Sequence, residues 1–147
     1  MIRRATLLAV ALGGCVALAG CASTAIIPTP SPAAIIGTWR HGSDTLTIDA
    51  DGTFSLRNIP KSVIEQAPVA RGAQPGGPSE SVTGTWSIGS GGTDAGGAPG
   101  VQLDFVHPRK VGFDYGLTLI VAGTSPERLY VNLGRPDTGD RYNFTRR

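Results

Sequence analysis

The chain has only two cysteines among its 147 residues, Cys15 and Cys21. Cys15 lies in an N-terminal apolar stretch with the features of an export leader, so we expect the mature chain to keep Cys21 alone. A single cysteine cannot form a disulfide within the chain, and the count also excludes CxxC metal sites and redox motifs. The stability of the folded part must therefore come from its hydrophobic core.

Histidine is equally scarce, because the chain contains only His41 and His107. Neither has a ligand-type side chain two or four residues away, so we expect no metal site and no other cofactor. His41 and Asp44 are near enough in sequence for a proton-transfer pair, but a histidine that ends a strand before a Gly-Ser turn is more often solvated. We expect the solvated turn histidine.

Blocks of positive charge are missing as well. Lys61 and Lys110 are the only lysines, and the arginines are scattered along the chain. Removal of a leader takes away Arg3 and Arg4, which leaves eleven basic and eleven acidic side chains. A mature chain with zero formal net charge and no basic cluster predicts no nucleic-acid partner.

The N-terminus does contain an export signal in three parts. Arg3 and Arg4 give a positive start, residues 5–19 are mostly apolar, and small residues close the segment. A membrane-spanning helix needs about 20 apolar residues and would carry a basic flank, so this run is too short. We therefore expect residues 1–20 to be a signal peptide that is removed.

The end of this leader reads Leu18, Ala19, Gly20, Cys21, which resembles the lipobox of bacterial lipoproteins. In that family a diacylglyceryl group is attached to the cysteine sulfur and a peptidase cuts before the modified residue. The resemblance implies that Cys21 is the first mature residue and carries at least two acyl chains, enough for stable anchoring. It implies a membrane location facing away from the cytoplasm, with the outer membrane possible in a two-membrane cell.

The chain also resembles, in its arginine, alanine and glycine content, small exported lipoproteins of GC-rich bacteria. Residues 21–34 contain Pro28, Pro30 and Pro32 and are expected to form a lipidated, extended tether with few contacts to the domain that follows. At about 3.1 Å per residue such a spacer reaches about 40 Å.

From residue 35 onward the apolar residues recur at every second position. The stretch DTLTIDADGTFSL predicts a hairpin that turns at Asp51 and Gly52, because glycine accepts the positive φ of a tight turn. Beside these two strands, the alternation predicts six more, at residues 37–41, 82–89, 101–106, 115–121, 128–133 and 141–146. One short helical turn is expected at residues 61–66.

Eight short strands separated by Gly- and Pro-rich segments indicate an all-β domain over residues 35–147, an antiparallel meander barrel or a sandwich. The alternation places mainly large side chains inside, which favours a filled core. The expected inward residues are Trp39, Leu46, Ile48, Phe54, Leu56, Val82, Trp86, Ile88, Val101, Leu103, Phe105, Leu117, Leu119, Val121, Leu129, Val131, Leu133, Tyr142 and Phe144.

Two similar heptads, GTWRHGS at residue 37 and GTWSIGS at residue 84, each combine an inward tryptophan with an expected Gly-Ser turn. We favour two independent strand starts over duplication of a half-barrel, because nothing else in the two halves aligns. Trp39 and Trp86, together with Asp51 and Gly52, are assigned structural roles.

Gly37-x-Trp39 at the start of the first of eight strands resembles the lipocalins. The resemblance implies an arginine near the end of the barrel packed over the tryptophan ring, for which Arg141 and Arg146 are the candidates. It also implies a carrier of a small apolar ligand.

Two further patterns suggest chemistry. Residues 49–52, DADG, begin like a calcium loop, but the loop position that requires a bidentate glutamate does not hold one, so the hairpin turn is preferred. Asp137 and Asp140 are a paired-carboxylate candidate, although acids flanked by arginines in a Pro/Gly turn more often form surface ion pairs. We therefore assign no catalytic residue.

Three function classes remain open at this point. The first, which we prefer, is a non-enzymatic interaction or structural module of the cell envelope that contacts a protein partner. The second is a lipocalin-like carrier, which requires a hollow interior. The third is an envelope hydrolase, which requires Asp137 and Asp140 to converge with a histidine in one cleft.

Overall fold

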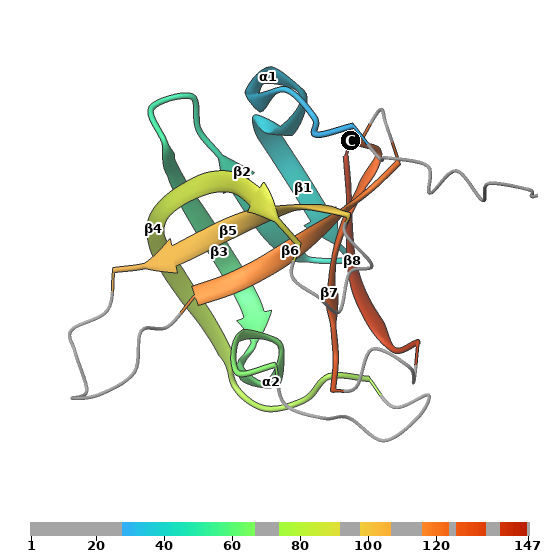
Figure 1. Ribbon diagram of the computed structural model, residues 1–147. Coiled ribbons are helices and arrows are strands. Elements are labelled where there is room, and N and C mark those ends of the chain that lie inside the picture. The colour runs from blue at the N-terminus through green and yellow to red at the C-terminus, as the bar shows by residue number, and fades with distance from the viewer. Residues whose placement is uncertain are drawn as a thin grey trace, which may run out of the picture.

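A computed structural model describes residues 28–66, 74–91, 98–106, 116–123, 126–134 and 139–146. Eight antiparallel strands close into a single barrel in sequence order, with β1 paired to β8 (Figure 1). The expected all-β, eight-stranded antiparallel barrel is confirmed. The strands are β1 (Gly37–His41), β2 (Asp44–Ile48), β3 (Thr53–Pro60), β4 (Ser79–Ser90), β5 (Pro99–Phe105), β6 (Gly116–Ala122), β7 (Arg128–Asn132) and β8 (Arg141–Arg146).

The hairpin between β2 and β3 turns through residues 49–52, as the Asp-Gly signal predicts. The Asp51 carboxylate accepts hydrogen bonds from the backbone N–H of Thr53 at 2.9 Å and from its hydroxyl at 2.7 Å. These bonds lower the pKa of Asp51, and Gly52 has a φ of +87°. The two bonds to Oδ1 of Asp51 and the positive φ of Gly52 stabilise the expected hairpin turn.

Strand β3 extends past the point where the alternation stops. The pairing of β3 with β4 shifts register between Leu56 and Ile59, and Asn58 has a φ of 62°. A bulge of this kind bends the strand and lets the pairing resume. Ile59 therefore returns to the core, where its side chain is fully buried.

The barrel interior is lined by the inward positions that the alternation predicts. Most of the expected side chains are buried, and Trp39, Leu103 and Phe144 have no exposed surface. Trp86, Ile88 and Phe105 were expected inside but are only partly buried and pack against the edge of this cluster. The alternation missed four further core residues, which come from helices or follow the bulge: Ile35, Ile59, Val63 and Ile64.

The N-terminal approach to the barrel differs from the extended spacer expected over residues 21–34. Pro30 is buried, and α1 (Pro32–Ile35) forms one helical turn with proline at its start. Proline fits there because its fixed φ suits the first turn and its missing N–H is not needed. Ile35 is fully buried, so this segment belongs to the packed domain. Residues 21–27 lie outside the described part of the chain.

The two tryptophan heptads differ in structure. Gly42 and Ser43 form the two-residue turn after β1, whereas Gly89 and Ser90 lie within β4, so the second Gly-Ser turn was wrongly predicted. The glycines differ as well. Gly37 has a φ of +136°, whereas a Cβ on Gly84 would lie 1.9 Å from the Asp104 carbonyl oxygen. Glycine is thus needed at the two equivalent motif positions for different reasons, which favours independent strand starts over duplication of a half-barrel.

The short helix expected near residue 61 is confirmed as α2 (Lys61–Ile64). Figure 1 shows α1 and α2 at opposite ends of the barrel. We call these two ends of the barrel the α1 end and the α2 end. The α1 end carries the turn at residues 49–52 and the last residues of β8. The α2 end carries the turn at residues 42–43 and the first residues of β8.

Candidate functional site

The proposed lipidation residue, Cys21, lies outside the described residues, as do His107 and Asp137. The other selected positions lie within the barrel or its turns. At each end of the barrel, side chains that are distant in sequence are brought together. These two groups are the candidates for a functional site.

At the α1 end, Arg146 packs over Trp39. The guanidinium carbon lies 4.8 Å from the indole centroid, and Nη2 donates a hydrogen bond to the Ile36 carbonyl at 2.5 Å. The Trp39 indole N–H donates to the Ile35 carbonyl at 2.9 Å. An arginine over Trp39 is thus confirmed for Arg146, whereas Arg141 lies over Tyr130, 4.4 Å from its ring centroid. These contacts fasten α1 across the end of the barrel.

Trp86 has a similar structural role at the neighbouring turn. Its indole N–H donates to the Asp49 carbonyl at 2.8 Å, and its backbone N–H donates to the Gly52 carbonyl at 2.9 Å. Both tryptophan N–H groups therefore bind backbone carbonyls. Neither is left to orient a ligand inside the barrel.

At the α2 end, Asp44 is a buried carboxylate whose hydrogen bonds come from three parts of the chain. The Tyr142 hydroxyl donates to Oδ2. Oδ1 accepts from Asn58 Nδ2 at 2.8 Å and from Ser43 Oγ at 3.1 Å. Asp44 is only 8% exposed, so these donors replace the water that it loses. We call Ser43, Asp44, Asn58 and Tyr142 the Asp44 cluster.

The local backbone of three strands produces the Asp44 cluster. Asp44 is the first residue of β2 and shares the inward face with Leu46 and Ile48. Asn58 reaches Asp44 from the β3 bulge, in a left-handed conformation that asparagine adopts more easily than most residues. Tyr142 is an inward residue of β8. The signal that the sequence analysis missed is therefore a polar residue, Asp44, at an inward position.

His41 packs beside the Asp44 cluster but does not pair with Asp44. Its ring centroid lies 4.0 Å from that of Tyr142. Its Nδ1 donates to the Asn143 backbone carbonyl at 2.8 Å. The solvated turn histidine is therefore wrong, because the ring is half-buried and hydrogen-bonded. The alternative, a proton-transfer pair of His41 and Asp44, is also not seen among the described hydrogen bonds of Asp44.

The chemistry of the Asp44 cluster is that of a neutral donor beside a carboxylate. Burial of the phenol and the adjacent Asp44 raise the pKa of Tyr142 far above its ordinary value of 10.0. Tyr142 therefore stays protonated and keeps donating to Asp44 over the physiological pH range. A tyrosine that stays protonated is not a general base, and its hydrogen bond to Asp44 links β8 to β2.

The hydrolase hypothesis needs Asp137 and Asp140, and the structure describes only Asp140 of these two. Asp140 lies at the α2 end, where its backbone carbonyl accepts from the Leu133 N–H at 3.0 Å. Within the described ranges, no hydrogen bond or ion pair joins Asp140 to His41, and no three His, Cys, Asp or Glu side chains gather as metal ligands.

Two outer surfaces remain. Hydroxyl side chains stand in cross-strand register on β1 to β4, in the row Thr38, Thr47, Ser55 and Thr83. A shallow hollow of about 640 Å³ at the α1 end is lined by Ala34, Pro126, Glu127, Thr145 and Arg146.

No protein-family model, curated protein sequence or solved structure matches this chain. Among the described residues, no helix is both long enough and apolar enough to cross a membrane. The function must therefore be argued from the residues themselves.

Proposed function

We propose that the chain is a lipid-anchored protein of the bacterial cell envelope, attached to the membrane through acyl chains on Cys21. In this proposal the barrel is a non-enzymatic interaction or structural module that meets its partner with an outer surface or with its loops. The leader, the lipobox-like residues 18–21 and the lone cysteine support the anchor.

The Asp44 cluster is the observation that favours a module over a carrier or an enzyme. A ligand site usually presents a few polar groups to its occupant from an apolar lining. Here the buried Asp44 carboxylate already takes its donors from Tyr142, Asn58 and Ser43 of the barrel itself. The rest of the inward set is apolar, and all of it is buried except Trp86, Ile88 and Phe105, which are partly buried. This arrangement supports a function that uses the outside of the barrel.

Metabolic labelling of the expressed precursor with an alkyne fatty acid tests the anchor. The wild-type chain should incorporate the label and lose residues 1–20. Cys21→Ser should abolish both changes, because the sulfur that accepts the lipid is absent. Cys15→Ser is the matched control and should be labelled like the wild type. Label retained on Cys21→Ser would contradict the anchor.

A lipocalin-like carrier of a small apolar ligand is the second candidate. The closed eight-stranded barrel favours it, because barrels of this size are wide enough either for packed side chains or for one small ligand. The Arg146 and Trp39 contact fits the same resemblance. Ligand binding by the folded domain separates the two candidates, as set out in the Discussion.

A further inference from the structure

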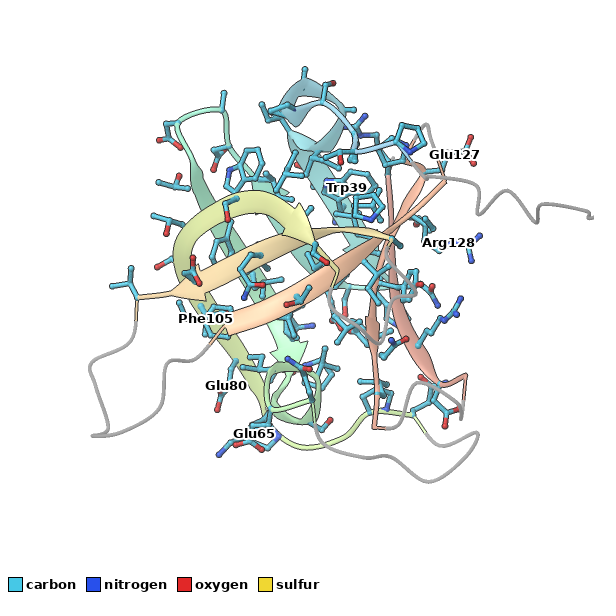
Figure 2. The ribbon with its side chains drawn as sticks, viewed as in Figure 1. Trp39, Glu65, Glu80, Phe105, Glu127 and Arg128 are labelled. Atoms are coloured by element: carbon cyan, nitrogen blue, oxygen red, sulfur yellow. The ribbon has the colours of Figure 1, made fainter. Side chains whose placement is uncertain are left out.

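The position at which the chain enters the barrel defines which end lies closer to an N-terminal anchor. Pro30 is buried and Ile35 is fully buried, and Trp39 holds the Ile35 carbonyl. The chain is thus fixed to the α1 end from residue 30 onward. Figure 2 labels Glu127 and Arg128 beside this end, and Glu65 and Glu80 at the α2 end.

The covalent reach from the anchor to this fixed point is short. Nine residue steps separate Cys21 from Pro30, and a fully extended chain spans at most about 3.6 Å per residue, or about 32 Å. This limit is below the reach of about 40 Å expected for a free spacer over residues 22–34, because residues 30–35 are part of the packed domain. The anchor therefore restricts how far the α1 end can move from the lipid.

We infer that the α1 end is the face of the barrel held against the membrane surface, and that the α2 end with the Asp44 cluster points away from it. This inference rests on the proposed acylation of Cys21. The partner of the α1 end is the layer of lipid headgroups in the membrane that carries the anchor. The α2 end and its connections are then the part of the barrel that another envelope component meets first.

The side chains at the α1 end suit headgroups and not the hydrocarbon core. Glu127, Arg128 and Arg146 are exposed there and include both signs of charge. Among the described residues, the large apolar side chain with high exposure is Val106, at 72%. It directly follows Phe105, which Figure 2 places away from α1. The α1 end therefore rests on the polar surface of the bilayer without inserting an apolar side chain.

The lack of other free thiols provides a clean test. In the mature acylated chain Cys15 is gone and the Cys21 sulfur carries lipid, so one introduced cysteine is the only thiol available to a dye. Glu127→Cys marks the α1 end and Glu65→Cys marks the α2 end, and both positions are exposed. Glu65 loses only a surface ion pair with Lys61 at 3.4 Å, which contributes little to stability.

Each acylated variant is labelled with a donor dye and added to preformed phosphatidylcholine vesicles that contain a rhodamine-headgroup lipid as the acceptor. Strands β1 and β3 have five and eight residues, and a rise of about 3.3 Å per residue at a tilt of about 40° separates the two ends by about 13 to 20 Å. Energy transfer from position 127 should therefore be at least about twofold more efficient than from position 65. Equal transfer, or stronger transfer from position 65, would overturn the orientation.

A longer tether is the matched control. Insertion of a 20-residue Gly/Ser segment between Ile27 and Pro28 should move the ratio of the two transfer efficiencies toward one, because a flexible linker of about 20 residues no longer restricts the barrel. An unchanged ratio would contradict an orientation set by tether length. Mass spectrometry of each preparation separates this test from that of the anchor. Absence of acyl groups on Cys21 would overturn the proposed function as well, whereas acylated protein with the wrong ratio overturns the orientation alone.

Discussion

At the scale of single residues, the buried Asp44 carboxylate depends on hydrogen-bond donors from other parts of the chain. Asp44 lies in the interior only because Tyr142, Asn58 and Ser43 supply hydrogen bonds to both of its oxygens. Loss of one partner leaves part of a buried carboxylate unsatisfied, and such a loss costs more than the bond itself contributes in net terms. The cluster therefore makes the fold sensitive to small changes at its α2 end.

Tyr142→Phe tests this sensitivity. The substitution removes the hydroxyl that donates to Asp44 but keeps the ring that packs against His41, so we expect a loss of about 1 to 3 kcal/mol in unfolding free energy. Urea denaturation at neutral pH measures it. Tyr130→Phe on the outer face is the matched control and should change stability by less. Equal effects of the two substitutions would contradict the role of the cluster.

The raised pKa of Tyr142 predicts a further difference at alkaline pH. The unfolded tyrosine loses its proton near its ordinary pKa of 10.0, whereas the folded one keeps it to higher pH. The folded state then binds more protons, so this contribution is complete below pH 10 and declines as the pH rises above it. Denaturation between pH 8 and 11 should show a steeper loss of stability in the wild type than in Tyr142→Phe. Parallel curves would rule out this contribution.

Two phenylalanines of the core, Phe144 and Phe105, differ in how far they are buried. Phe144 has no exposed surface, whereas Phe105 is half-buried at the edge of the core. Phe144→Ala should destabilise the domain by about 3 to 5 kcal/mol, since it leaves a cavity in the interior. Phe105→Ala should cost clearly less, although the alternation of apolar residues treats both positions as inward. Thermal denaturation orders the two variants, and a larger loss for Phe105→Ala would be inconsistent with this core.

At the scale of secondary-structure elements, the one-turn helix α1 acts as part of the barrel. It is too short to be stable alone, so its conformation depends on the burial of Ile35 and on the indole of Trp39. Arg146 adds a bond to the Ile36 carbonyl from the last strand. The two ends of the domain sequence thus hold each other at the α1 end.

Ile35→Ala should lower the unfolding free energy by about 2 to 5 kcal/mol, because it creates a cavity next to Trp39. Ala33→Ser, at an exposed position of the same turn, is the control and should have little effect. Deletion of residues 28–32 should also lower the melting temperature, whereas a free spacer would leave it unchanged. An unchanged melting temperature in both Ile35→Ala and the deletion would show that the segment does not dock.

At the scale of the whole molecule, the question is whether the barrel carries a ligand. The inward positions hold large apolar side chains, and twelve of the largest are almost completely buried. Side chains of this size suit an eight-stranded barrel that is filled by its own residues. The proposed module and the alternative carrier therefore differ in one measurable property of the folded domain, its capacity for an apolar guest.

We expect no saturable binding of an environment-sensitive apolar dye or of a fatty acid to the native wild-type domain. The reason is that packed side chains leave no site to occupy. Fluorescence titration against the folded and the urea-unfolded domain measures this. Stoichiometric binding to the folded domain, abolished by narrowing the interior with Val131→Phe, would promote the carrier over the module.

The sequence by itself determined the strand pattern of this protein. In a strand, successive side chains point to opposite faces, so an alternating apolar pattern identifies both the strand and its inward face. Strands β1 and β8 have the bounds that this pattern predicts. Asp51 and Gly52 specified a turn through local hydrogen bonds and a positive φ. The lipid anchor is likewise expected from a local pattern, residues 18–21.

Only the tertiary structure decided the contacts between distant positions. The closed barrel, the choice of Arg146 over Arg141 for Trp39, and the meeting of Asp44 with Tyr142 and Asn58 depend on strand pairings across the whole chain. The bulge that carries Asn58 and the docking of α1 do not follow from a period of two. Local patterns fix which face a residue occupies, whereas its partner depends on register and closure, which the chain establishes only when it packs.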